Sequence, residues 1–171
     1  LGSYFQLSFV DAPMNGGNDH SDTDAAMADL ITRANAACER GDRAAAMRCL
    51  AAARQRPPAT ADEALTLGYL TLNLEESDVA LQYFTIAACL APRQSFTHAS
   101  RALALQLLDR SEEASQAARR ALQLNPKDGV ALKVLARISL NAQRPSDARL
   151  CCLKILSQNP DDPDAKLMLR E

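Results

Sequence analysis

Residues 114–126 read ASQAARRALQLNP, and residues 148–160 read ARLCCLKILSQNP. Both stretches begin with alanine and end with proline, as do residues 46–58 (AMRCLAAARQRPP) and 80–92 (ALQYFTIAACLAP). The closing prolines are therefore 34 residues apart throughout: Pro58, Pro92, Pro126 and Pro160. An internal period of this length indicates an array of similar supersecondary units.

Two columns of small residues keep the same period as the prolines. Alanine stands twelve residues before each proline, and alanine or, once, isoleucine stands five residues before it: Ala46, Ala80, Ala114 and Ala148; Ala53, Ala87, Ala121 and Ile155. Helices approach each other closely only where side chains are small, so these columns predict where the second helix of a pair packs on the first. Each proline prevents that second helix from continuing.

A 34-residue unit with small residues in these columns and a closing proline resembles the tetratricopeptide repeat. The resemblance implies an all-α fold, a right-handed superhelical solenoid of four helix-turn-helix repeats at 27–60, 61–94, 95–128 and 129–162. Residues 163–171 would begin a capping helix, so that the repeat domain spans 25–171. We expect helices at about 25–40, 43–56, 61–74, 77–90, 95–109, 112–124, 129–142 and 146–158, with a ninth from Pro163.

Short polar residues predict where the helices begin. Thr60 and Glu63 have the spacing of a capping box, and Asp162 precedes Pro163 at the expected start of the last helix. Four further residues are expected to cap the second helices: Asp42, Ser77, Ser111 and Ser146. One departure from the family pattern concerns the glycine usual in the first helix, which appears only as Gly68; alanine replaces it at Ala34, Ala102 and Ala136.

Residues 1–24 lie before the repeats. Leu1, Gly2 and Ser3 resemble the remnant of a cleaved tag, and Met14 is an alternative natural start. Residues 4–10 alternate as an extended strand would, and residues 11–24 have the composition of a flexible linker. Two interpretations of residues 4–10 remain: a tail without structure, or a peptide that occupies a groove.

The composition excludes several classes of function. Net charge is −2 and lysine and arginine are scattered, so nucleic acid is not an expected partner. The five cysteines are odd in number and form no C-x-x-C pair, which predicts reduced thiols and no metal or other cofactor. No apolar stretch reaches the roughly 20 residues of a membrane span. We therefore expect a cytoplasmic protein that does not insert into a membrane.

In tetratricopeptide repeats the first helix of each unit lines a concave face, and the resemblance transfers this role to matching positions. The implied peptide-binding residues are Asn35 in the first repeat, Leu65, Tyr69, Leu72 and Asn73 in the second, Phe96, Leu103, Gln106 and Leu107 in the third, and Arg137 and Asn141 in the fourth. For Leu65, Leu103 and Leu140 the alternative is an ordinary place in the core.

One specialised subfamily clamps the terminal carboxylate of heat-shock chaperones with a lysine, two asparagines, a lysine and an arginine. Only Asn35 matches that set; the other four positions hold Ile31, Thr66, Phe96 and Ser100. A carboxylate clamp is therefore not expected. Leucine and phenylalanine at these places predict an extended, partly apolar ligand.

No nucleophile, base and acid stand in a catalytic arrangement, and no glycine-rich loop follows a strand. The sequence thus predicts a non-enzymatic interaction module or small chaperone, a monomer or weak dimer, that binds a segment of another polypeptide. The segment from Tyr4 to Pro13, in cis or in trans, is one candidate. In size and organisation the chain is similar to bacterial type III secretion chaperones. The alternatives are an oligomeric assembly scaffold, or an accessory domain of a larger enzyme or secretion machine.

Overall fold

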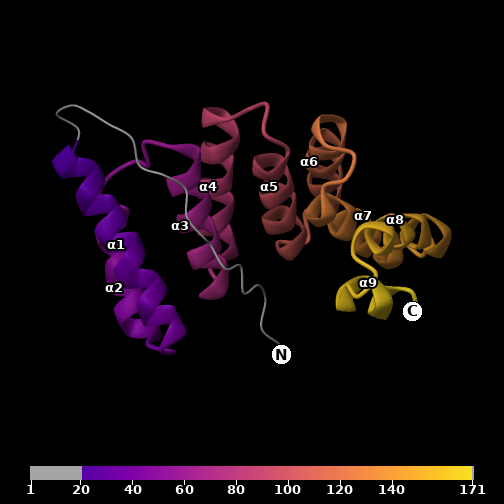
Figure 1. Ribbon diagram of the computed structural model, residues 1–171, viewed down its shortest axis with the longest axis horizontal. Coiled ribbons are helices and arrows are strands. Elements are labelled where there is room, and N and C mark those ends of the chain that lie inside the picture. The colour runs from indigo at the N-terminus through magenta and orange to yellow at the C-terminus, as the bar shows by residue number, and fades with distance from the viewer. Residues whose placement is uncertain (1–20, 171) are drawn as a thin grey trace. The chain divides into compact units, whose positions relative to one another are not determined.

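The computed structural model describes residues 21–170, with side chains from residue 26 onward. Its contacts divide the chain into two compact units, residues 1–57 and residues 58–171, and each is described by itself. All regular secondary structure in the described residues is helical (Figure 1). The tag remnant and most of the predicted linker lie outside the described residues.

The first unit is a helical hairpin of α1 (Ser21–Glu39) and α2 (Arg43–Ala53). Helix α1 begins at Ser21, four residues before the expected start. Gly41 turns the chain with a φ of 72°, a conformation that glycine adopts without steric cost. Asp42 then caps α2 as predicted, because its side chain accepts a hydrogen bond of 2.9 Å from the backbone N–H of Ala45.

The second unit consists of three helix pairs and a short final helix. The helices are α3 (Ala61–Asn73), α4 (Ser77–Leu90), α5 (Ser95–Leu107), α6 (Ser111–Leu124), α7 (Gly129–Asn141), α8 (Pro145–Gln158) and α9 (Pro163–Met168). Each first helix packs on its own second helix and on the first helix of the next pair: α3 on α5, α5 on α7 and α7 on α9 (Figure 1). The predicted all-α fold of helix-turn-helix units is confirmed.

The alanine columns lie at the contacts between paired helices. Ala46, Ala80 and Ala114 are completely buried, and their counterpart Ala148 is nearly so. Ala114 belongs to a core cluster in which α6 meets α5 through Ala102 and other small side chains. Helix pairs approach closely here because no side chain is longer than a methyl group at these positions.

The turn between the two helices of a pair has the same backbone conformation in every repeat. Its central residue has a left-handed backbone in every copy, again at intervals of 34: Gly41, Glu75, Asp109 and Gln143, with φ between 56° and 72°. In the second copy the N–H groups of Glu75 and Glu76 donate to the carbonyls of Leu72 and Thr71, both at 2.9 Å. This pairing is a Schellman motif, which satisfies the last carbonyls of the first helix.

The Schellman motif explains why the predicted serine caps are wrong. It makes the residue after the left-handed one the N-cap, which is Glu76, Arg110 or Arg144. Ser77, Ser111 and Ser146 therefore fall inside the helix, where the side chain no longer caps the exposed N–H groups. The other predicted caps are confirmed: Thr60 and Glu63 form a capping box, and Asp162 accepts from the N–H of Ala165.

Gly68 is required by its neighbour Phe84. A methyl group at Gly68 would overlap the aromatic ring of Phe84, a fully buried side chain of α4. The residues 34 positions later form a smaller pair, Ala102 with Ala118, within one core cluster. The single glycine of this column thus compensates for the large aromatic side chain opposite it.

Candidate functional site

The candidate site is the partly exposed side of the three A helices, which are α3, α5 and α7, the first helices of the pairs in the second unit. We call it the A-helix face. It consists of Tyr69, Leu72 and Asn73 on α3, Phe96, Leu103, Gln106 and Leu107 on α5, and Arg137, Leu140 and Asn141 on α7. Contacts of α5 with both α3 and α7 make these helices neighbours. The structure thus brings together most of the side chains that the resemblance implied.

Tyr69 is held in place from two sides. Its ring meets the ring of Phe84 edge to face, with centroids 5.0 Å apart, and its hydroxyl lies 2.5 Å from Oγ of Ser100 on α5. Burial raises the pKa of the Tyr69 phenol, so the hydroxyl stays protonated at neutral pH. Tyr69 therefore presents a fixed, neutral aromatic surface where two consecutive repeats meet.

Helix α5 supplies the most exposed apolar side chains of the A-helix face. Phe96 is 42% exposed in its first turn and Leu107 is 46% exposed at its last residue. Leu103 lies between them and packs partly on the core, as Leu72 does on α3. Apolar side chains that remain exposed on one helix provide surface that a ligand can cover.

Leu65 takes the core alternative, because it is only 6% exposed and belongs to the cluster around Phe84. The amide side chains of the A-helix face lie at or near the C-terminal ends of the helices. Asn73 and Asn141 are the exposed last residues of α3 and α7, and Gln106 is the last but one of α5. Asn35 lies exposed on α1, in the first unit.

The positions of the carboxylate clamp hold no cation in the second unit. Ser100 is buried against Tyr69, and the hydroxyl of Thr66 donates to the backbone carbonyl of Asp62 at 2.8 Å. Phe96 is apolar. These side chains cannot bind a terminal carboxylate in the way that lysine and arginine do.

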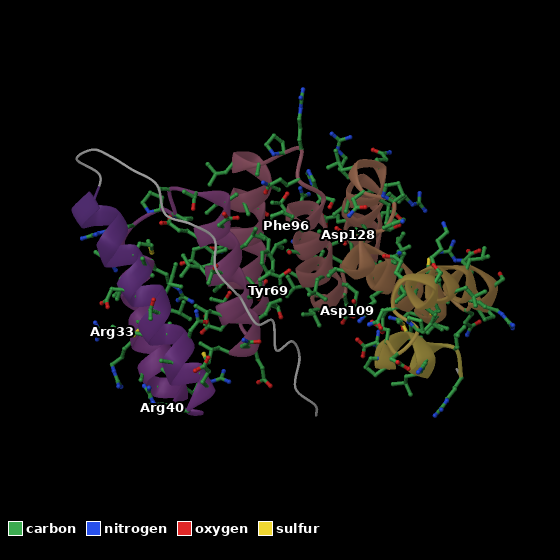
Figure 2. All side chains as sticks on the ribbon, viewed as in Figure 1. Arg33, Arg40, Tyr69, Phe96, Asp109 and Asp128 are labelled. Carbon is green, nitrogen blue, oxygen red and sulfur yellow. The ribbon has the colours of Figure 1, made fainter. Side chains whose placement is uncertain are left out.

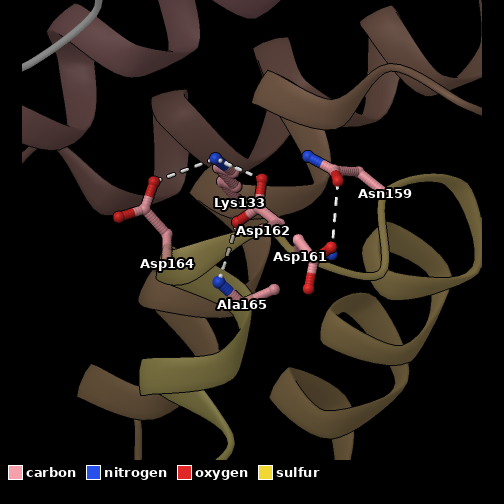
Figure 3. A network of polar contacts seen from close by, with 6 residues as sticks. All are labelled: Lys133, Asn159, Asp161, Asp162, Asp164 and Ala165. Carbon is pink, nitrogen blue, oxygen red and sulfur yellow. Dashed lines mark hydrogen bonds and ion pairs between the residues drawn. The ribbon is translucent and has the colours of Figure 1, made fainter.

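A lysine on α7 is paired within the protein. Nζ of Lys133 lies 2.8 Å from a carboxylate oxygen of Asp162 and 2.9 Å from one of Asp164 (Figure 3). Burial alone would lower the pKa of Lys133, but the two hydrogen bonds outweigh it and the pKa is raised. For Asp162 burial alone would raise the pKa. The hydrogen bonds from Lys133 and from the N–H of Ala165 outweigh it, and the pKa is lowered.

This network was not anticipated from the sequence, because Lys133 and Asp162 lie 29 residues apart in the chain. It fastens α9 to α7, since Asp162 is both the partner of Lys133 and the N-cap of α9. The aspartate before Pro163 was the available signal, although it indicated only the cap. Lys133 therefore serves the packing of the last helix.

No group of three or more His, Cys, Asp or Glu side chains is placed to hold a metal ion within the part of the chain that the structure describes. Nε2 of His98 lies 3.0 Å from the backbone carbonyl of Pro92. Among the described helices, none is long and apolar enough to cross a bilayer. The A-helix face offers aromatic, aliphatic and amide groups, whose chemistry is suited to binding a polypeptide.

Comparison with known proteins identifies the repeats. Residues 101–171 match the family model for the tetratricopeptide repeat. This part of the chain carries tetratricopeptide repeats. No curated protein sequence matches it significantly.

Solved structures share the tetratricopeptide repeat fold of the chain. YrrB, a TPR protein with an unusual peptide-binding site, has a TM-score of 0.71 at 16% identity, and the match covers 88% of this chain and 78% of YrrB. The pilF protein of Pseudomonas aeruginosa has a TM-score of 0.69 at 24% identity, with coverage of 86% and 68%. The first TPR of Spaghetti (RPAP3), bound to the HSP90 peptide SRMEEVD, has a TM-score of 0.61 at 20% identity, with coverage of 65% and 88%.

Proposed function

We propose that the tetratricopeptide repeats form a non-enzymatic interaction module whose A-helix face holds an extended, partly apolar segment of a partner polypeptide. The observation that carries this proposal is the exposure of Phe96 and Leu107 at the two ends of α5, beside the fixed ring of Tyr69. Burying two such side chains would contribute about 1.5–3 kcal/mol each.

The spacing of these side chains suits an extended peptide. Eleven residues separate Phe96 from Leu107, which corresponds to about 16 Å along the helix. An extended chain covers that length with about five residues. Asn73 and Gln106 near the helix ends can donate to and accept from the backbone of such a segment. Apolar contacts would supply affinity, and the amides would fix the direction of the peptide.

The comparisons support this proposal in general terms. Two proteins of the same fold bind peptides, since YrrB has a peptide-binding site and the RPAP3 repeat is bound to an HSP90 peptide. The HSP90 peptide ends in an acidic sequence, whereas the A-helix face has no cation at the clamp positions. We therefore propose an apolar segment as the ligand of this chain.

The segment from Tyr4 to Pro13 is our candidate occupant, in cis or in trans. It lies outside the described residues and contains Phe5, Leu7 and Phe9 in alternation. A role as a type III secretion chaperone, a cytoplasmic location and a monomeric or weakly dimeric state stay predictions.

An assembly scaffold is the second candidate function. Leu150 and Leu153 on α8 are 61% and 49% exposed, and their spacing of three residues places them on one side of that helix. A second copy of the chain could cover them. A rise in mass with concentration, abolished by Leu150→Ser and Leu153→Ser together, would favour the scaffold.

Peptide binding tests the leading proposal. A labelled peptide of residues 4–13 is titrated with the chain shortened to begin at Met14, and fluorescence anisotropy reports binding. Phe96→Ala and Leu107→Ala should each weaken binding about tenfold, since each removes roughly 1.5 kcal/mol of apolar contact. Arg119→Ala on α6 is the matched surface control and should leave the affinity unchanged. Equal affinities for all four proteins would exclude the A-helix face as the site.

A further inference from the structure

The hairpin of α1 and α2 carries a groove of its own, with a volume of about 490 Å³. Small side chains from both helices line it, among them Ala37 and Ala45, together with three arginines, Arg33, Arg40 and Arg48. No acidic side chain is among the lining residues. The α1–α2 groove belongs entirely to the first unit and shares no residue with the A-helix face.

The arginines of the α1–α2 groove form few ion pairs with acidic side chains of the protein. Arg33 and Arg40 are seven residues apart, two turns along α1, and thus lie on one side of that helix (Figure 2). Arg33 pairs with Asp29 at 3.4 Å, but both side chains are about two thirds exposed, so water screens the pair. Neither Arg40 nor Arg48 makes an ion pair with any described residue.

Helix α2 and the residues that follow it carry only basic charges. Residues 43–57 contain four arginines and no aspartate or glutamate. The hairpin also carries Asp29, Glu39 and Asp42, but none of these three lines the groove, so the positive charge is local to the groove lining. A nucleic acid would need a longer row of cations and would be repelled by the rest of the chain. A short anionic ligand meets neither difficulty.

We propose that the α1–α2 groove is a second binding site, which takes an acidic segment of a partner polypeptide. Guanidinium groups bind carboxylates through two parallel hydrogen bonds, and the small side chains between the arginines let a peptide backbone come close. The volume falls within the usual range of ligand sites. Arg33 and Arg40 are about 10.5 Å apart along the helix axis, which a peptide in the polyproline II conformation spans in about three residues, with every third side chain on one face. The preferred ligand has an acidic residue at about every third position.

A synthetic octapeptide tests the proposal on the full chain. The probe is an alanine peptide with aspartate at positions 2, 5 and 8, and the control probe has asparagine there. Nuclear magnetic resonance follows the Nε–Hε signals of the arginines and the backbone amides. The acidic probe should shift the signals of Arg33, Arg40 and Arg48, and the control probe should not. Shifts confined to α3, α5 or α7 would overturn the proposal.

Removing two arginines from the groove, or two from elsewhere, distinguishes binding at this site from nonspecific electrostatic attraction of the probe. Arg40→Gln with Arg48→Gln should weaken binding of the acidic probe at least tenfold. Arg119→Gln with Arg120→Gln removes the same charge from the exposed side of α6 and should change the affinity less than twofold. Equal weakening by the two double variants would mean nonspecific attraction and would overturn the proposal. The test of Phe96 and Leu107 is independent of it.

The arginine signals also distinguish two other possible occupants of the groove, a segment of the chain itself and a second copy of the chain. The chain's own residues 11–24 contain four aspartates and no lysine or arginine. Asp11→Asn with Asp19→Asn should leave the arginine signals of the free protein unchanged. A shift on that substitution, with no binding of the probe, would assign the groove to this segment and overturn the proposal. Shifts that grow with protein concentration would assign it to a second copy, with the same consequence.

Discussion

Lys133 and Asp162 form an ion pair, with Nζ and Oδ2 separated by 2.8 Å and both side chains largely shielded from water. The pair joins the middle of α7 to the start of α9. Since Asp162 also caps α9, one carboxylate determines both where the last helix begins and what it packs on.

Removal of the lysine should therefore loosen the C-terminal end of the repeats. We expect Lys133→Met to lower the free energy of unfolding by about 1–2 kcal/mol, because it leaves Asp162 buried without its cation. Unfolding in urea measures the change. Lys166→Met is the control, since its partner Asp161 is 94% exposed and such pairs contribute about 0.5 kcal/mol or less. Equal losses from the two variants would contradict the assigned role of Lys133.

The same pair predicts a dependence of stability on pH. The pKa of Asp162 is lower in the folded protein than its ordinary value of 3.8, so the unfolded chain binds more protons in this range. The contribution of Asp162 is therefore present above pH 3.8 and is lost as the pH falls through the folded pKa. Urea unfolding between pH 5 and pH 2.5 should show a smaller acid loss for Asp162→Asn than for the natural sequence. An equal loss of stability in acid for the two proteins would contradict this prediction.

The left-handed turn residues predict a stabilising substitution. Gln143 has a φ of 56°, which is strained for a residue with a Cβ atom. Gln143→Gly should raise the free energy of unfolding by about 0.5–1 kcal/mol, and Gln143→Ala should change it little. At the corresponding position of the first repeat, Gly41→Ala should destabilise. Thermal unfolding checks all three, and no gain from Gln143→Gly would mean that the turn is not strained.

Gly68 and Phe84 predict a compensating pair of substitutions. Gly68→Ala should destabilise by about 1–3 kcal/mol, because the new methyl group overlaps the Phe84 ring. Phe84→Leu in the same chain should recover part of that loss, since the first repeat has alanine and leucine at these two positions, Ala34 and Leu50. A double-mutant cycle in urea measures the coupling, and purely additive losses would contradict it.

The sequence predicts the helices well because their limits are set by local chemistry. Most observed bounds agree with the predicted ones within one or two residues, since the prolines and the alanine columns repeat in register. The serine caps failed because a cap depends on the turn before it. Nothing in the sequence shows which residue of a turn adopts the left-handed conformation when only Gly41 of the four is glycine.

The candidate site was harder to predict, because a position in a repeat does not specify its neighbours. Leu65 and Leu103 are one helical turn apart in the repeat pattern, yet Leu65 is buried in the core cluster of Phe84, and Leu103 is partly exposed. The α1–α2 groove was not predicted, because the family pattern assigns ligand binding to the first helix of each pair, whereas this groove is lined by both helices. The available signal was the spacing of Arg33, Arg40 and Arg48, which lie seven and eight residues apart.

Tyr69 belongs at once to the A-helix face, to the core through Phe84 and to the next repeat through Ser100. A ligand bound to its ring would therefore stabilise the contact between α3 and α5 in addition to making its own contacts. Such a ligand raises the cooperativity of unfolding, because α3 could no longer separate from α5 without releasing it. Occupancy of this one ring would make the second and third repeats unfold together.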